Sequence, residues 1–190
     1  MGVLKEPRKL RADALRNRER ILAVAREAFA EGGASVTLED IVRLSGLGTG
    51  TLYRHFPTRD ALMEALYLSE MEKLAAAERE LSATLPPVEA LREWMRLFVD
   101  LMATKLALKE ALNAMVCGPE DLYAASGEMI RTAITTLTDR AVAAGEIRLE
   151  IEPLDLLRAL AGVANASPGA DWKASARRMV DMLIAGMKPS

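Results

Sequence analysis

Small and hydrogen-bonding side chains gather around residue 50 of this chain of 190 residues. Leu52 and Phe56 stand four positions apart, so both are expected on the inner face of one short helix. Thr49, Gly50 and Thr51 then begin its outer face. Hydroxyls near a helix start can bond to base edges in a DNA major groove, and glycine permits a close approach. The pattern therefore predicts a surface that contacts nucleic acid, with base contacts at these three positions.

Donors that suit phosphate oxygens surround this helix. They are the hydroxyls of Thr37, Thr49 and Tyr53 and the imidazole of His55. Arg59 follows Thr58, the expected cap of the next helix, and a cation in the first turn opposes the helix dipole by about 0.3–1 kcal/mol. A DNA phosphate is expected to compensate this cation. An exposed arginine tolerated at small cost is the alternative.

Other basic residues supply further candidate DNA contacts. Arg43 and Arg54 are possible guanine readers, because a guanidinium pairs with two guanine acceptors at once. Six cations occupy thirteen positions near the N-terminus: Arg8, Lys9, Arg11, Arg16, Arg18 and Arg20. We expect Arg8, Lys9 and Arg11 to form an arm before the first helix that enters the minor groove. A solvated helix start is the alternative.

Composition argues against catalysis and against a metal or cofactor site. The chain has one histidine, His55, and one cysteine, Cys117, so the histidine has no second imidazole and no nucleophile beside it. No His-Glu-x-x-His motif and no glycine-rich phosphate loop occurs. A lone cysteine suits a reducing compartment, and no apolar run is long enough to span a membrane. With a charged N-terminus that lacks a secretory signal, these features predict a cytoplasmic protein that is not an enzyme.

Helical spacing of apolar residues runs through nearly the whole chain, and no alternating run typical of a strand reaches five residues. Helices are predicted over about 13–31, 38–44, 48–55 and 59–81, and others follow to give about nine in all. Thr37 and Asp40 form a capping-box pattern before the second helix, and Gly46 suits the left-handed turn after it. Pro57 must end the third helix. The predicted fold class is all-α.

Charge and helix order together suggest two domains. Residues 1–59 carry a net charge of +4 and the remainder carries −6, so the basic part suits a polyanion. We expect a three-helix, helix-turn-helix DNA-binding domain with a basic arm at 1–58. A long fourth helix joins it to a second domain at 59–190, in which the apolar faces of the last two helices predict dimerisation.

Residues 36–62 read V-T-L-E-D-I-V-R-L-S-G-L-G-T-G-T-L-Y-R-H-F-P-T-R-D-A-L and closely resemble the signature block of TetR-family DNA-binding domains. The preceding helix and Glu31-Gly32-Gly33 extend the resemblance to about 12–66. The C-terminal two thirds are similar only in helix pattern and length. The resemblance implies a dimeric, all-helical regulator whose third helix lies in the major groove, with phosphate contacts near Tyr53.

The resemblance also implies how the protein acts. We expect a ligand-responsive repressor that binds a pseudo-palindromic operator as a homodimer and is released by a small apolar effector in the C-terminal domain. An activator, or a regulator controlled by a protein partner without a small-molecule effector, is the closer alternative. A helical enzyme is the distant one, because the chain offers few convergent catalytic groups.

Two groups of residues in the C-terminal part carry these expectations. Apolar and polarisable side chains on helices that resemble the family's pocket walls are Trp94, Met95, Phe98, Met102, Met115, Cys117, Tyr123 and Met129. The alternative is that they fill a core, because core and pocket share one periodicity. The last two helices are apolar over more than one face, so a second subunit is expected to cover Leu154, Leu157, Ala161, Trp172, Ala176, Met179, Val180 and Leu183.

Overall fold

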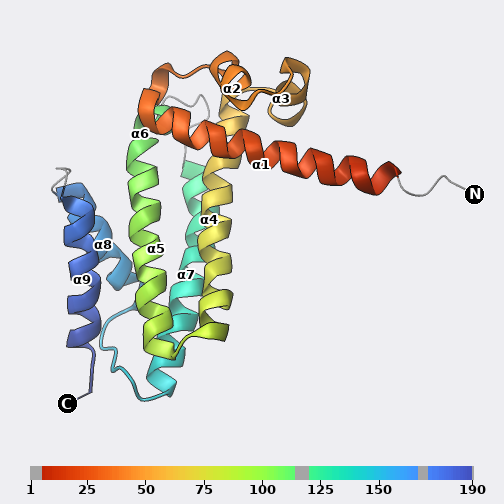
Figure 1. Cartoon of the computed structure of the whole chain (residues 1–190). Helices are drawn as coiled ribbons and strands as arrows, with labels where there is room; N and C mark the ends of the chain where they lie inside the picture. Colours follow the sequence, from red (N-terminus) through yellow and green to blue (C-terminus); the bar gives the residue numbers. More distant parts are fainter. Residues whose placement is uncertain (1–5, 114–119, 167–170, 190) are drawn as a thin grey trace, which may run out of the picture. The chain divides into compact units, whose positions relative to one another are not determined.

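The computed structural model describes residues 6–113, 120–166 and 171–189. Every regular element in these ranges is a helix, so the predicted all-α class is confirmed (Figure 1). The elements are α1 (Glu6–Gly32), the 3-10 helix η1 (Gly33–Ser35), α2 (Leu38–Ser45), α3 (Thr49–His55), α4 (Arg59–Thr84), α5 (Pro87–Ala107), α6 (Lys109–Asn113), α7 (Glu120–Ala143), α8 (Pro153–Ala166) and α9 (Trp172–Gly186). Among the described residues, no helix is long and apolar enough to cross a membrane.

The chain forms two compact units. The N-terminal unit takes the described residues of Met1–Tyr67 and Ala107–Pro119, and the C-terminal unit takes those of Leu68–Leu106 and Glu120–Ser190. The helix α4 contributes residues to both units.

The N-terminal unit is built on α1, which packs against α2, α3 and η1. Its apolar stripe of Ile21, Ala25 and Phe29 has no exposed surface. The helix begins at Glu6, earlier than the predicted start near residue 13, because Pro7 is tolerated in a first turn and good helix formers follow it.

Local capping contacts set the ends of the helix-turn-helix as the sequence predicts. The backbone N–H of Asp40 donates to the Thr37 hydroxyl at 3.2 Å, and the Thr37 N–H donates to the Asp40 carboxylate at 3.1 Å, so the capping box is confirmed. Gly46 ends α2 in the left-handed region with φ 64°. The Thr58 hydroxyl accepts from the Ala61 N–H at 3.1 Å and caps α4.

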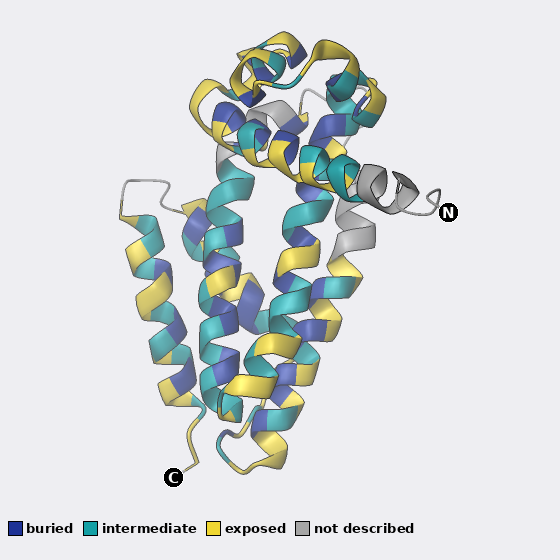
Figure 2. Ribbon diagram, turned by 45° about the vertical axis from the view of Figure 1, so that its right-hand side comes forward, coloured by how far each residue is buried: buried dark blue, intermediate teal, exposed yellow. Residues whose placement is uncertain are grey.

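The core of the C-terminal unit centres on α5. The indole N–H of Trp94 donates to the backbone carbonyl of Leu74 on α4 at 2.8 Å, which ties α5 to α4. The Trp94 ring stacks with that of Phe98 at a centroid separation of 6.4 Å. Helices α7, α8 and α9 pack in succession. Buried, partly exposed and exposed residues alternate along the helices of this unit (Figure 2).

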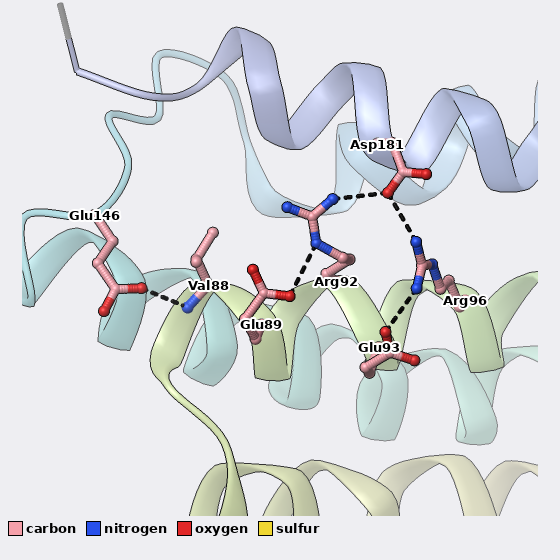
Figure 3. Close-up of polar contacts among 7 residues, drawn as sticks. All are labelled: Val88, Glu89, Arg92, Glu93, Arg96, Glu146 and Asp181. Atoms are coloured by element: carbon pink, nitrogen blue, oxygen red, sulfur yellow. Dashed lines mark hydrogen bonds and ion pairs between the residues drawn. The ribbon is translucent and has the colours of Figure 1, made fainter.

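Helices α5 and α9 meet through a charge ladder, whose residues recur every four positions on each helix. The ladder consists of Arg92, Arg96 and Asp100 on α5 and of Lys173, Arg177 and Asp181 on α9. Asp181 accepts from Arg92 at 2.7 Å and from Arg96 at 2.9 Å (Figure 3). At the other end Asp100 pairs with Lys173 at 2.7 Å and Arg177 at 3.0 Å.

Each helix of the ladder therefore presents two cations and then one aspartate, and the two stripes match only when the helices run antiparallel. The Arg92 guanidinium, with Arg96, lowers the pKa of the Asp181 carboxyl below its ordinary value. Partly exposed pairs contribute only about 0.2–1 kcal/mol each, so the ladder sets the direction and register of α9 more than its stability.

Candidate nucleic-acid interface

The short helix α3 presents the outer face predicted from its sequence. Leu52 has no exposed surface and Phe56, which follows the helix, is 2% exposed, so these side chains hold α3 against the core. Thr49 and Gly50 are exposed and Thr51 is partly exposed. A side chain added at Gly50 would meet only Nη2 of Arg54, at 3.8 Å. Packing within the chain therefore does not demand glycine at this position, whereas a molecule approaching from outside would benefit from it.

Two of the three hydroxyls predicted to bind phosphate, those of Thr37 and Tyr53, donate to carboxylates of α2. The Thr37 hydroxyl donates to Oδ2 of Asp40 at 2.8 Å, and the Tyr53 hydroxyl donates to Oε1 of Glu39 at 2.9 Å. The sequence indicates Asp40 only as the capping-box partner of Thr37 and assigns no role to Glu39. The Thr37–Asp40 spacing could have indicated the first bond, but no local pattern links Glu39 to Tyr53, fourteen positions away.

The two possible guanine readers are also engaged within the chain. Nη2 of Arg43 donates to Asp40 at 2.9 Å, and Nε of Arg54 donates to the carbonyl oxygen of Gly50 at 2.9 Å. The Arg43 guanidinium, followed by the Thr37 hydroxyl, lowers the pKa of the Asp40 carboxyl to about 2. Both arginine side chains are on exposed residues, so they remain placed to contact a ligand.

Arg59 makes contacts that its position in the sequence does not reveal. Its Nε donates to the carbonyl of Val36 and its Nη2 to that of Ala34, each at 3.1 Å. The guanidinium carbon lies 5.1 Å from the centroid of the Phe29 ring. Carbonyl oxygens and an aromatic face thus supply the negative potential for which the sequence analysis proposed DNA phosphate. A phosphate contact by Arg59 stays a prediction.

Replacing Arg59 by Met should lower the free energy of unfolding by about 1–3 kcal/mol, because two carbonyls lose charged donors. Lys should restore only part of this, since one ammonium does not reproduce the planar fork of a guanidinium. Urea denaturation measures both effects. Arg158→Met, at an exposed residue paired with Asp155 on α8, is the control and should change stability by less than about 0.5 kcal/mol. Unchanged stability with weaker DNA binding would leave phosphate contact as the sole role of Arg59.

The basic cluster near the N-terminus belongs to α1. Arg8, Lys9 and Arg11 lie within this helix, so the arm expected before it is not extended; their side chains lie outside what the structure describes. The Arg18 guanidinium lies 5.3 Å from the Phe56 ring centroid. Nη2 of Arg20 approaches Gly46, at 3.3 Å from the position that a side chain there would occupy. Two cations of the cluster therefore contact the helix-turn-helix.

The imidazole of His55 is partly exposed at the end of α3. Its ring centroid lies 6.1 Å from that of Phe56, with the two planes tilted by 41°. This position at the edge of the interface is compatible with the predicted phosphate contact, which stays a prediction.

The candidate effector residues occupy different environments in the C-terminal unit. Trp94, Met95 and Phe98 are buried, and Met102 and Met129 are partly exposed. Met129 lines an open groove of about 540 Å³ beside Glu78 and Arg79. Met115, Cys117 and the side chain of Tyr123 lie outside the described residues.

The candidate residues of the dimer interface are likewise partly buried and partly exposed. Leu157, Ala176 and Val180 are buried within the chain. Those that keep exposed surface are Leu154, Ala161, Trp172, Met179 and Leu183. Met179 and Leu183 line a second groove of about 540 Å³ together with Met182, which is 66% exposed and which the sequence analysis did not name.

Comparison with known proteins identifies both parts of the chain. Residues 21–66 match the model of bacterial regulatory proteins of the tetR family. Residues 86–189 match the model of the C-terminal domain of SbtR-like transcriptional regulators.

Relatives and solved structures agree with these matches. The regulator UidR of Escherichia coli is 34% identical over 98 residues, which cover 51% of this chain and 44% of UidR, so the chain spans less than half of this relative. A TetR regulator of Streptomyces coelicolor is 45% identical, with a TM-score of 0.81 over 91% of this chain and 99% of that one. A TetR protein of Mycobacterium vanbaalenii is 32% identical, with a TM-score of 0.78 over 95% and 99%. These proteins are transcriptional regulators and not enzymes, and this chain belongs to the TetR family of DNA-binding transcriptional regulators.

Proposed function

We propose that the protein is a repressor that binds a pseudo-palindromic operator as a homodimer and is released by a small apolar effector. The observation that carries the DNA-binding part is the outer face of α3, where Thr49 and Gly50 are exposed while Leu52 anchors the helix. A recognition helix needs this division, because base edges are read by its first outward residues.

Contacts on the DNA divide by role. Thr49, Gly50 and Thr51 read bases, with Arg43 or Arg54 pairing to a guanine. Thr37, Tyr53, His55 and Arg59 contact phosphates and fix the register, as do the cations of the first helix. Exposure supports these roles: Thr37, Arg43 and Arg54 are exposed, and Tyr53, His55 and Arg59 are partly exposed.

The homodimer is proposed to form through α8 and α9. Met182 is 66% exposed and Ile151 is 49% exposed, and both line the groove that contains Met179 and Leu183. Exposed apolar side chains of this size are costly to leave in water, and a two-fold contact would cover the same patch on both subunits. A two-fold axis also matches the symmetry of a pseudo-palindrome.

The effector is proposed to act on the C-terminal unit. Met129 in its groove offers a partly exposed apolar contact, and Met102 is partly exposed on α5. Binding there would shift α4, which runs without interruption from Arg59 to Thr84, and would change the spacing of the two recognition helices.

A regulator without a small-molecule effector is the second candidate. The burial of Trp94 and Met95, both without exposed surface, favours it because these side chains act as core. Thermal shifts with a panel of apolar compounds distinguish the two, since a ligand of the folded state raises the melting temperature. The compounds that stabilise the protein should also release it from DNA.

Selection of bound sequences from random duplexes, followed by footprinting, tests the DNA-binding proposal. We expect two inverted half-sites about 10 base pairs apart, or a multiple of this, and two chains per operator. Thr51→Ala should alter the preference among sequences, whereas Tyr53→Phe should weaken binding to all of the selected operator sequences alike. A monomer in solution without sequence preference would contradict the proposal.

A further inference from the structure

Two adjacent carboxylates in the first turn of α2 accept hydrogen bonds from the hydroxyls that are proposed to bind phosphate. Glu39 accepts from Tyr53 at 2.9 Å, and Asp40 accepts from Thr37 at 2.8 Å. A hydroxyl carries one proton, so it cannot donate fully to a carboxylate and to a phosphate at the same time. Each of these phosphate contacts must therefore replace a bond that exists in the free protein.

The two carboxylates differ in how firmly they are held. Asp40 completes the capping box with the Thr37 N–H and also accepts from Arg43, so its removal would disturb the start of α2. Glu39 is exposed, and its bond to Tyr53 joins α2 to α3 rather than capping a helix. The Glu39 bond is therefore the one that a ligand can replace without disturbing the cap.

We propose that Glu39 is a specificity-determining residue whose carboxylate competes with DNA phosphate for the Tyr53 hydroxyl. This inference rests on the proposed function. Only a duplex that seats a phosphate in good geometry at Tyr53 replaces the internal bond. On other sequences the bond persists, and the carboxylate repels the phosphate backbone. Glu39 thus weakens non-specific binding more than operator binding. It therefore raises the ratio of the operator affinity to the non-specific affinity.

The charge of Glu39 persists at neutral pH. A hydrogen bond to its own backbone, followed by that from Tyr53, lowers the pKa of this carboxyl below its ordinary value. The same bond raises the pKa of the Tyr53 hydroxyl, so Tyr53 keeps its proton for donation. Charge removal by substitution is therefore a cleaner test than a change of pH.

The test compares Glu39→Gln with the wild type on the selected operator and on a scrambled duplex of equal length. The amide keeps an acceptor oxygen for Tyr53 but removes the charge. We expect the affinity for the scrambled duplex to rise about 3- to 10-fold and the operator affinity to rise less. Glu64→Gln removes the same charge from an exposed residue of α4 and should change neither affinity more than about 2-fold. An unchanged or weakened scrambled complex in Glu39→Gln would overturn the proposal.

A double-mutant cycle with Tyr53→Phe separates competition from simple repulsion. In the Tyr53→Phe background there is no hydroxyl proton to compete for. Glu39→Gln should therefore raise the affinity for the scrambled duplex less than it does in the wild type. An equal rise in affinity in both backgrounds would overturn the proposed competition. Failure of the wild type to prefer any sequence would instead refute the proposed function itself, so the two failures are distinguishable.

Discussion

Operator affinity is expected to fall by about 10³-fold or more when the salt concentration rises from about 50 to about 200 mM. The reason is counterion release: each phosphate that a cation neutralises frees bound counterions, and added salt opposes this. The chain places six cations in the thirteen positions 8–20, and a dimer carries each of them twice. Fluorescence anisotropy of a labelled operator at several salt concentrations gives the slope of log affinity against log salt. A flat plot would contradict DNA binding through phosphates.

Single substitutions assign parts of that slope to named cations. Arg20 is exposed and lies next to Gly46 in the helix-turn-helix, so Arg20→Gln should reduce the slope by about 0.9 for each phosphate contact that it removes. Arg158→Gln on α8 should leave the slope unchanged. Equal changes in the two variants would show that net charge, and not a contact made by Arg20, determines the salt dependence.

The sequence predicts those parts of the interface that depend on neighbours along one helix or turn. Thr37 and Asp40 are three positions apart, so their reciprocal capping bonds follow from local geometry. Leu52 and Phe56 turn inward because one helical turn separates them. The end of α2 at Gly46 follows from the freedom of glycine to adopt positive φ.

Contacts between elements escaped the sequence analysis because they depend on the angles at which helices pack. Arg59 reaches carbonyls 23 and 25 positions earlier in the chain, and Tyr53 reaches Glu39 on another helix. Polar side chains at such distances carry no periodic signal. The early start of α1 has a different reason: no glycine or proline lies between Arg8 and Asp13 to end the helix, so the helix continues beyond its apolar stripe.

The four-residue spacing of the charge ladder is visible in the sequence but does not by itself predict the contact between α5 and α9. Its members recur every four residues on α5 and on α9, which is the spacing of an exposed helix face as much as of a helix contact. Only the antiparallel arrangement of the two helices reveals that each aspartate pairs with two cations of the other helix. Figure 3 shows this for Asp181 with Arg92 and Arg96.

Residues that fill a core and residues that line an effector pocket have the same helical spacing, so the sequence leaves the role of Trp94 open. The structure places this side chain without exposed surface and bonds its indole N–H to Leu74. Trp94→Ala is therefore expected to lower the free energy of unfolding by about 3–5 kcal/mol, the range for deleting a large buried aromatic. Trp94→Phe keeps most of the apolar volume but loses one hydrogen bond. Loss of that bond should lower the free energy of unfolding by about 1 kcal/mol.

Urea denaturation at one fixed protein concentration measures these losses, because a dimer's stability depends on concentration. Leu97→Ala is the matched control: Leu97 lies on the same helix and is 40% exposed, so its truncation leaves little cavity and should cost less than about 1 kcal/mol. If Trp94→Ala cost no more than Leu97→Ala, the indole would border open space and an effector pocket beside it would be favoured. A large loss would mean that an effector enters this region only by displacing packed side chains, and the regulator without a small-molecule effector would gain support.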